Sequence, residues 1–214
     1  MPRLFAFGCS YTYGYSLEDN YENSVTKPSN LAWPKLVASE LKIECINKGV
    51  TGASNTKILV EILDSTFEKD DIVIFLWSYM HRGLLIESPE ISINMMPPVP
   101  HPLKKQYYQV HNQYDLLVRS VMDMHHANLF LSSKGIKTYN FYIDRTINNL
   151  NDSKLSNLLK DIDLIYIDLR KFRLDLAMDK MHPGPISHKE IANFILETVK
   201  KDDIISLLYS NTVV

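Results

Sequence analysis

The stretch IVIFLW, Ile72 to Trp77, decides the fold class. It is an unbroken apolar run rich in β-branched residues, and it follows the acidic pair Asp70-Asp71. A strand that is covered on both faces has such a run, whereas a strand with one solvent face alternates between apolar and polar residues. The pattern therefore predicts a strand inside a sheet that carries helices on both faces.

The segments on either side of this run alternate between strand and helix patterns. Ser54 to Phe67, for example, places its large aliphatic residues on one helical face. The other predicted strands are Arg3–Gly8, Ile43–Asn47, Ile136–Ile143 and Leu164–Leu169, and the other predicted helices are Asn30–Leu41, Gln106–Ser133, Asp152–Lys160 and a last one marked by a capping box of Ser187 and Glu190. This alternation predicts an α/β fold, a three-layer α/β/α sandwich with a central five-stranded, mostly parallel sheet.

One stretch departs from the alternation. Met80 to Pro102 contains five prolines, at positions 89, 97, 98, 100 and 102. We expect a long ordered loop or lid there, an insertion at about residues 80–105 that governs specificity. The 214 residues otherwise suit one core, so the sequence predicts a single domain over residues 1–214.

Composition excludes several classes of protein. Apolar residues make up 45% and charged residues 22% of the chain, and the net charge is −2. Nothing in this balance predicts attraction to nucleic acid or to an anionic membrane, and no run of about 18 apolar residues predicts a membrane span. Cys9 and Cys45 form neither a disulfide framework nor a CxxC pair, and no signal peptide is evident, so we expect a cytoplasmic protein.

Ligands of open α/β sheets bind outside the carboxyl ends of the strands. The chain segments expected at that edge carry polar residues among glycines and prolines. They are GCSYTYG with Ser10, NKGVTGASN with Gly52 and Asn55, LWSYMHR with Ser78 and Arg82, and DKMHPGP with Asp179 and His182.

Together these segments contain the groups that nucleophilic acyl transfer needs. That chemistry uses a hydroxyl on a tight turn, an imidazole to take its proton, a carboxylate to orient the imidazole, and donors for the oxyanion. Ser10, His182 and Asp179 match the first three requirements, and the backbone N–H groups of Ser10 and Gly52 match the fourth. Each residue alone has an ordinary explanation, as a turn serine, a surface carboxylate or an exposed turn histidine.

The same segments resemble a known family, the SGNH or GDSL-type serine hydrolases. FGCSYTYG is similar to the family's Gly-Asp-Ser block, with Cys9 in place of Asp, NKGVTGAS to its second block, and DKMHP to its D-x-x-H-P block. The resemblance spans essentially the whole chain and implies a flavodoxin-like sandwich without a cofactor. It also implies Ser10 as nucleophile, Asp179 and His182 as its partners, and Gly52 in the oxyanion hole. A small acyl ester is the implied substrate class, with an O-acetylated carbohydrate as a specific candidate.

The third block departs from the family pattern. The family has G-x-N-D after the third strand, where the Asn donates to the oxyanion, and this chain has WSYMHR. Either Ser78, Arg82 or Asn55 replaces the asparagine, with Ser78 favoured by position, or activity is weak. Arg82 is alternatively a ligand for a substrate carboxylate or phosphate, and Trp77 is a candidate for an aromatic substrate cleft. The W-S-x-x-x-R pattern resembles a branch with phage and bacterial members, which leaves a phage-encoded or virion-associated protein open.

Other interpretations stay open at this point. The chain is alternatively a non-catalytic binding or structural module that keeps the fold. SYTYG also resembles a flavin phosphate loop, although some 15 residues, from Ser16 to Asn30, precede the next predicted helix. Cys9 is a less suitable nucleophile, since strand alternation directs it away from Ser10. His125-His126 face different sides of a helix, so no metal site is predicted.

Overall fold

The computed structural model describes residues 2–21, 27–88, 91–96 and 100–201. Within these residues the central sheet has five parallel strands in the order β2-β1-β3-β6-β7. Their bounds are Arg3–Gly8 for β1, Glu44–Asn47 for β2, Ile72–Trp77 for β3, Lys137–Tyr142 for β6 and Leu164–Tyr166 for β7. The predicted α/β class with a five-stranded parallel sheet is confirmed.

The strand β3 has the central place that its sequence predicts. It pairs with β1 on one side, where Val73 faces Phe5, and with β6 on the other, where Val73 faces Thr138. Every residue of β3 is buried. An apolar strand with neighbours on both edges and helices on both faces leaves no side chain in water, which is why its composition is uniform.

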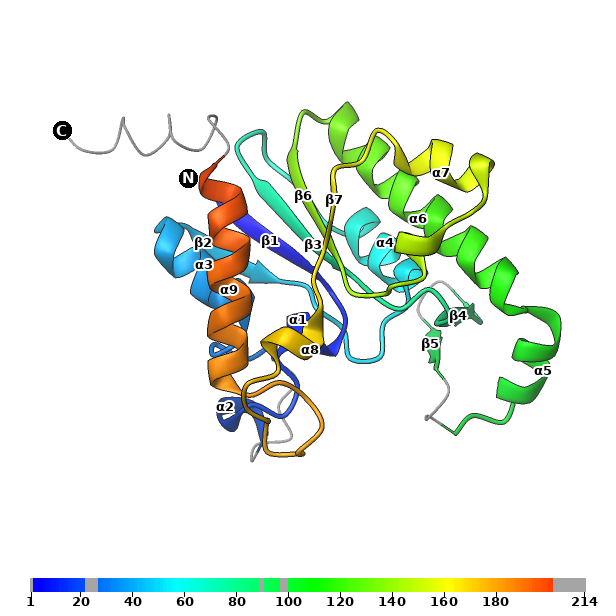
Figure 1. Cartoon of the computed structure of the whole chain (residues 1–214), viewed down its shortest axis with the longest axis horizontal. Coiled ribbons are helices and arrows are strands. Elements are labelled where there is room, and N and C mark those ends of the chain that lie inside the picture. The colour runs from blue at the N-terminus through cyan, green and yellow to red at the C-terminus, as the bar shows by residue number, and fades with distance from the viewer. Residues whose placement is uncertain (1, 22–26, 89–90, 97–99, 202–214) are drawn as a thin grey trace.

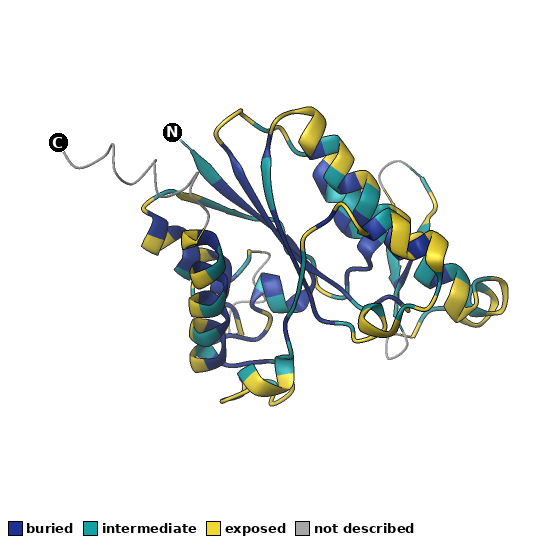
Figure 2. Cartoon of the chain, turned by 45° about the horizontal axis from the view of Figure 1, so that its top comes forward, coloured by how far each residue is buried: buried dark blue, intermediate teal, exposed yellow. Residues whose placement is uncertain are grey.

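Helices cover both faces of the sheet (Figure 1). The helices α3 and α9 pack together on one face, and α4 and α6 pack together on the other, with α7 against α6. Their bounds are Trp33–Leu41 for α3, Asn55–Leu63 for α4, Gln113–Ser133 for α6, Ser153–Leu159 for α7 and Pro185–Lys200 for α9. Figure 2 shows the buried residues along the strands and on the helix sides that face them.

Several short elements were not predicted. These are α1 (Ser10–Tyr13), α2 (Glu18–Tyr21), α8 (Leu169–Phe172) and the 3₁₀ turn η1 (Ile147–Asn149). None of the helices in the described part of the chain is both long and apolar enough to cross a membrane.

The predicted helix Gln106–Ser133 is in fact two helices. The first is α5, Lys104–Val110, and the second is α6, which starts at Gln113. The side chain of Asn112 caps α6 by accepting the N–H of Asp115 at 2.9 Å. An Asn at this position competes with the helical backbone for its own hydrogen bonds, so it divides an otherwise continuous apolar pattern.

The predicted loop from Met80 to Pro102 contains an antiparallel hairpin. Its strands are β4, Gly83–Ile86, and β5, Ser92–Met95. The tyrosine hydroxyls of α5 hold it, since Tyr108 donates to the Met95 carbonyl at 2.8 Å. The expectation of a loop is wrong for the residues of these two strands, while Pro89, Pro97 and Pro98 lie outside the described residues.

The last helix does not begin with a capping box. Gly184 is its N-cap and Pro185 its first residue, so Ser187 lies inside the first turn. The carboxylate of Asp175 accepts the N–H groups of Ile186 and Ser187 at 3.0 and 2.8 Å and the Ser187 hydroxyl at 2.6 Å. A carboxylate from the preceding loop therefore accepts the free N–H groups of the first turn, which a capping serine would otherwise accept.

Candidate active site

Ser10 stands at the carboxyl end of β1, on the first residue of a one-turn helix. The chain leaves β1 at Gly8, passes Cys9 in an extended conformation and enters α1 at Ser10. Gly14 ends α1 in the left-handed conformation, with φ 74°, and its N–H donates to the Ser10 carbonyl at 3.0 Å. A positive φ of this kind is readily adopted only by glycine, so Gly14 lets the chain turn directly after the serine.

Ser10, His182 and Asp179 form a continuous hydrogen-bonded chain. His182 Nε2 lies 3.1 Å from Ser10 Oγ, and His182 Nδ1 lies 2.6 Å from Asp179 Oδ2. If Nδ1 carries the proton donated to Asp179, the lone pair of Nε2 faces the Ser10 hydroxyl, which is the tautomer a general base needs. The structure thus brings together three residues that the sequence predicted, from opposite ends of the chain.

The environment of Asp179 favours its ionised form. Partial burial alone raises the pKa of this carboxyl group, but the backbone N–H groups of His182 and Met181 donate to Oδ1 at 3.0 and 2.9 Å. These hydrogen bonds, together with the imidazole of His182, outweigh the effect of burial and hold the pKa of Asp179 below its ordinary value. Asp179 is therefore a fixed anion that orients the ring of His182.

The loop that carries Asp179 and His182 is closed at its base. Leu176 and Pro183 form a β-bridge, and the Ala177 N–H donates to the His182 carbonyl at 2.9 Å. Below the bridge, Asp175 is bonded to the first turn of α9, as described above. These contacts fix the loop to the first turn of α9, a long helix with one buried face, and so hold the imidazole beside Ser10.

Gly52 lies in the loop after β2, beside the turn that carries Ser10. This loop is attached to β1, because the Val50 N–H donates to the Gly8 carbonyl at 3.0 Å. Gly52 has φ 73°, and a Cβ atom there would lie 2.7 Å from the sulfur of Met96. Among the described residues no group accepts the N–H of Gly52 or of Ser10. Two backbone donors therefore remain available at this edge of the sheet.

Asn55 does not present its amide to this edge. It is fully buried, its Oδ1 accepts the Ser78 N–H at 2.8 Å, and its Nδ2 lies 3.4 Å from the Ser78 carbonyl and 3.6 Å from the sulfur of Met80. The predicted role of Asn55 as an oxyanion donor conflicts with these contacts, because both ends of the amide serve the loop after β3. Asn55 instead holds Ser78 in place.

Ser78 and Arg82 join the loop after β3 to the loop of Gly52. Arg82 Nη1 lies 3.0 Å from Ser78 Oγ and 3.4 Å from the Ala53 carbonyl, next to Gly52 in the chain. The guanidinium carbon also lies 4.9 Å from the ring centre of Tyr79. Because Arg82 donates to the Ser78 hydroxyl, the proton of that hydroxyl is left to donate elsewhere.

Trp77 does not line a cleft. Its side chain is fully buried, stacks on Phe75 with ring centres 4.4 Å apart, and donates from Nε1 to Asn140 Oδ1 at 2.9 Å. This position differs from the predicted substrate-binding role. In a strand that is buried on both faces, even a large aromatic residue at the end of the strand packs in the core.

Two tyrosines that the sequence analysis did not assign contact the imidazole. The ring centre of Tyr11 lies 5.7 Å from that of His182, and the Tyr15 ring meets it edge-on at 5.1 Å. Tyr11 also shares a hydrogen bond with the hydroxyl of Tyr79, and burial raises the pKa of both phenols. The signal was present in the sequence as the tyrosines that follow Ser10 in SYTYGY.

The remaining candidates lie elsewhere. Cys9 is fully buried, and the ring of His125 bonds to the Leu158 carbonyl at 2.9 Å. Within the residues described, no group of three His, Cys, Asp or Glu side chains is placed to hold a metal ion.

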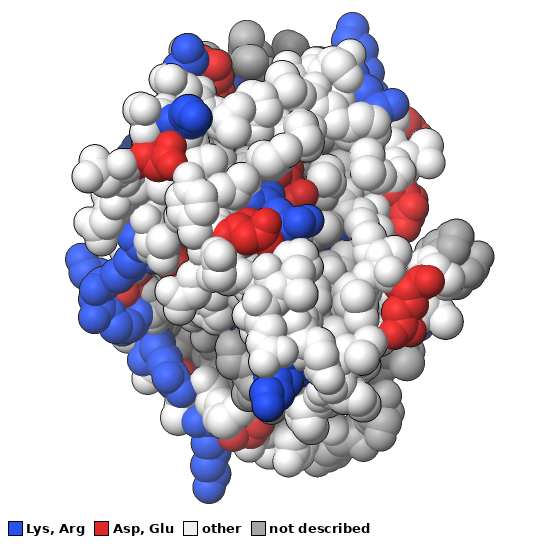
Figure 3. Space-filling model, turned by 90° about the vertical axis from the view of Figure 1, so that its right-hand side faces the viewer, with Lys and Arg blue, Asp and Glu red and all other residues white. Residues whose placement is uncertain are grey.

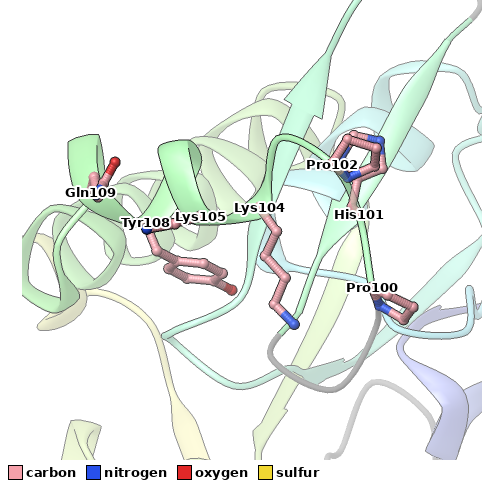
Figure 4. A pocket seen from close by; sticks show the side chains of 7 residues that line it. All are labelled: Pro100, His101, Pro102, Lys104, Lys105, Tyr108 and Gln109. Carbon is pink, nitrogen blue, oxygen red and sulfur yellow. The ribbon is translucent and has the colours of Figure 1, made fainter.

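A hollow of about 780 Å³ beside α5, bordered by His101 and Lys104, contains none of the predicted catalytic residues (Figure 4). The face in Figure 3 is largely uncharged with acidic and basic side chains scattered over it, and basic side chains are most numerous along its left margin.

Comparison with known proteins gives matches in structure alone. No protein-family model matches the sequence, and no curated protein matches it either. A lipolytic protein of the G-D-S-L family from Desulfitobacterium hafniense has a TM-score of 0.53 and 14% identity, over 92% of this chain and 99% of that one. A mutant of an acetylxylan esterase from Geobacillus stearothermophilus has a TM-score of 0.53 and 15% identity, over 92% of this chain and 93% of that one.

A third similar structure is a carbohydrate esterase whose active site has divergent catalytic and non-catalytic binding functions. It has a TM-score of 0.58 and 11% identity, over 95% of this chain and 70% of that one. Identities this low are informative about the fold and not about the reaction. The resemblance seen in the sequence blocks is confirmed at that level, and the chain has the fold of the SGNH, or GDSL-type, hydrolases.

Proposed function

We propose that the protein is a serine ester hydrolase that cleaves a small acyl ester through Ser10, His182 and Asp179. The observation that carries the proposal is the geometry of these side chains, with 3.1 Å between Ser10 Oγ and His182 Nε2 and 2.6 Å between His182 Nδ1 and Asp179 Oδ2. Both distances lie within hydrogen-bond reach, which a nucleophile and its base require.

The reaction follows from this arrangement. Ser10 Oγ attacks the ester carbonyl carbon while His182 Nε2 takes the hydroxyl proton, and the anionic Asp179 stabilises the imidazolium that forms. His182 then returns the proton to the leaving alcohol oxygen as the tetrahedral intermediate collapses to an acyl-serine. Water attacks the acyl-serine by the same proton route, which releases the acid and restores Ser10.

The oxyanion is proposed to form next to three donors. The backbone N–H groups of Ser10 and Gly52 are the first two, since neither has an acceptor among the described residues. As the third we propose the Ser78 hydroxyl, whose oxygen already accepts from Arg82. This side chain is fully buried in the free chain, so its proton reaches the oxyanion only if substrate binding uncovers it. This assignment replaces the asparagine of the family's third block with a serine that Arg82 holds in place.

The hairpin is proposed to border the acyl group. Asn94 of β5 donates to the Thr51 carbonyl at 3.2 Å, and the sulfur of Met96 faces Gly52. The end of the hairpin, at Asn94 and Met96, thus lies against the loop that carries the proposed oxyanion donor. We propose a short acyl group such as acetyl, since the similar structures include an acetylxylan esterase and a carbohydrate esterase.

The test is hydrolysis of p-nitrophenyl acetate by the purified chain and by its Ser10→Ala variant. We expect turnover by the unaltered chain and a loss of about 10⁶-fold in Ser10→Ala, as for other serine hydrolases that lose the nucleophile. Ser132→Ala, at an exposed position of α6, is the control and is expected to keep full activity. Equal rates in the Ser10→Ala variant and the unaltered chain would favour a non-catalytic binding module instead.

A further inference from the structure

Two half-buried tyrosines, Tyr11 and Tyr79, connect the imidazole of the site to the loop after β3. Tyr11 is the second residue of α1, directly after Ser10, and Tyr79 follows Ser78 at the carboxyl end of β3. Neither takes part in the bond-making steps described above. The contacts of these two side chains form one continuous path across the site.

The first contact of the path is between Tyr11 and His182. Their ring centres lie 5.7 Å apart, with an angle of 54° between the ring planes. Tyr15 adds a second ring contact, edge-on at 5.1 Å. The imidazole therefore packs against two rings of the segment that carries its nucleophile, so a movement of α1 and a movement of the imidazole are linked.

A hydrogen bond between the two phenols is the second contact. Burial is the main cause that raises the pKa of both, and the bond raises the pKa of Tyr11 further while it opposes the rise at Tyr79. This pattern is expected when the Tyr11 hydroxyl donates and the Tyr79 hydroxyl accepts. Both phenols are uncharged at neutral pH, so the pair joins its two ends without adding a charge to the site.

The third contact is between Tyr79 and Arg82. The guanidinium carbon of Arg82 lies 4.9 Å from the centre of the Tyr79 ring, within the range of a cation–π contact. Arg82 Nη1 donates to Ser78 Oγ at 3.0 Å and lies 3.4 Å from the Ala53 carbonyl. The path that begins at the imidazole thus ends at Ser78 and at the residue next to Gly52, which are the places of the proposed oxyanion donors.

We propose that Tyr11 and Tyr79 are positioning residues, which hold the imidazole of His182 in a fixed place relative to the oxyanion donors at Ser78 and Gly52. The proposal rests on the proposed esterase activity and adds two residues to it. The base and the oxyanion donors act on the same tetrahedral intermediate from different loops, and a misplacement of about 1 Å can lower a rate about 10²-fold. A direct link between the loops keeps both in register with the ester carbonyl.

The first test is a double-mutant cycle on the hydrolysis of p-nitrophenyl acetate. Tyr11→Phe and Tyr79→Phe each delete one hydroxyl and keep the ring, and each is expected to lower kcat about fivefold with little change in KM. The double variant should be no slower than either single variant, whereas independent effects would multiply to about 25-fold. Tyr142→Phe is the control, since it deletes the hydroxyl of a buried tyrosine of β6 that bonds to Asn148, and it should keep full activity.

The second test needs no turnover. The proton that His182 Nδ1 donates to Asp179 is followed by ¹H NMR, and its exchange with water measures how firmly the imidazole is held. We expect exchange to become several-fold faster in Tyr11→Phe and faster still in Tyr11→Leu, which also removes the ring, while Tyr142→Phe resembles the unaltered chain. A purely structural role would leave this exchange rate unchanged.

The outcomes separate the positioning role from the esterase activity. Multiplicative losses of kcat in the double variant, or an unchanged exchange rate of the His182 proton in Tyr11→Phe and Tyr11→Leu, would overturn the positioning role. A chain that hydrolyses no ester, but in which the tyrosine variants accelerate the exchange, refutes the esterase and leaves the contact of the tyrosines with His182 standing.

Discussion

The Nε2 atom of His182 lies 3.1 Å from the Oγ atom of Ser10, although 172 positions separate the two residues in the chain. The parallel sheet explains this approach, because it places the carboxyl end of β1 and the loop before α9 at the same edge. The side chains of Ser78 and Arg82 join the neighbouring loops at this edge. Each of these contacts has a consequence that can be measured.

Replacing Asp179 by Asn should nearly abolish turnover while leaving the fold intact. An amide at this position can donate to Nδ1 and thereby favour the tautomer that places a proton on Nε2, so His182 loses its function as a base. We expect kcat for p-nitrophenyl acetate to fall by about 10⁴, with an unchanged circular dichroism spectrum. A fall of less than tenfold would show that Asp179 does not orient His182.

Replacing Ser78 by Ala tests the proposed third oxyanion donor. Loss of one such donor typically lowers kcat by about 10²–10³ while KM changes little. The control is Ser120→Ala, at another buried serine, whose hydroxyl donates to the Met80 carbonyl at 3.3 Å. If both variants lose the same modest activity, the Ser78 hydroxyl is structural and the oxyanion hole has only backbone donors.

Replacing Arg82 by Lys separates its two interpretations. If Arg82 holds Ser78 to the Gly52 loop, a point-like ammonium keeps the charge but loses the planar donor group, and kcat for the neutral p-nitrophenyl acetate should fall by about tenfold or more. If Arg82 binds a substrate carboxylate or phosphate, the neutral ester should react normally. Steady-state kinetics with this ester therefore distinguishes positioning of the loops from recognition of an anion.

His188 makes stability dependent on pH. It is almost fully buried, accepts the Trp33 N–H at the start of α3 at 3.2 Å, and burial is the main cause that lowers its pKa to about 4. The pKa of His188 in the unfolded chain is about 6.5. Between about pH 6.5 and pH 4, His188 therefore binds a proton in the unfolded chain but not in the folded chain. The stabilisation present above about pH 6.5 should therefore be lost as the pH falls, at up to about 1.4 kcal/mol per pH unit.

Urea unfolding at several pH values, with His188→Gln for comparison, measures this effect. The variant should show a shallower decline in the free energy of unfolding between about pH 6.5 and 4. Asp123 has the opposite influence, since burial raises its pKa to about 6, but it is the same in both proteins and cancels in the difference. Parallel curves for the two proteins would contradict the assignment to His188.

Sequence patterns predicted the parts of the fold that depend on burial along a continuous segment. β1 and β3 have the bounds that their apolar runs predict, because both strands are covered by neighbours along their whole length. The hairpin was not predicted, because its two strands are short and the many prolines around them indicated a loop. The division between α5 and α6 was missed because a single cap, Asn112, overrides the apolar pattern on either side.

The candidate site was predictable to the extent that its chemistry depends on residue type. Ser10, Asp179 and His182 could be found because few residue types serve as nucleophile, carboxylate and base. The contacts of Asn55 and Trp77 could not be found, since an amide or an indole at a strand end is equally able to face a ligand or the interior. The contact of Asp175 with α9 depends on how the preceding loop folds back, and the contact of Tyr15 with His182 joins distant parts of the chain, so neither follows from a local pattern.

The most direct test of the central claim is covalent labelling with a fluorophosphonate, followed by mass spectrometry of the peptides. We expect a single adduct on Ser10, formed at a rate that His182→Ala lowers strongly. A folded chain that remains unlabelled, or an adduct on another residue, would contradict the assignment of Ser10 as the nucleophile.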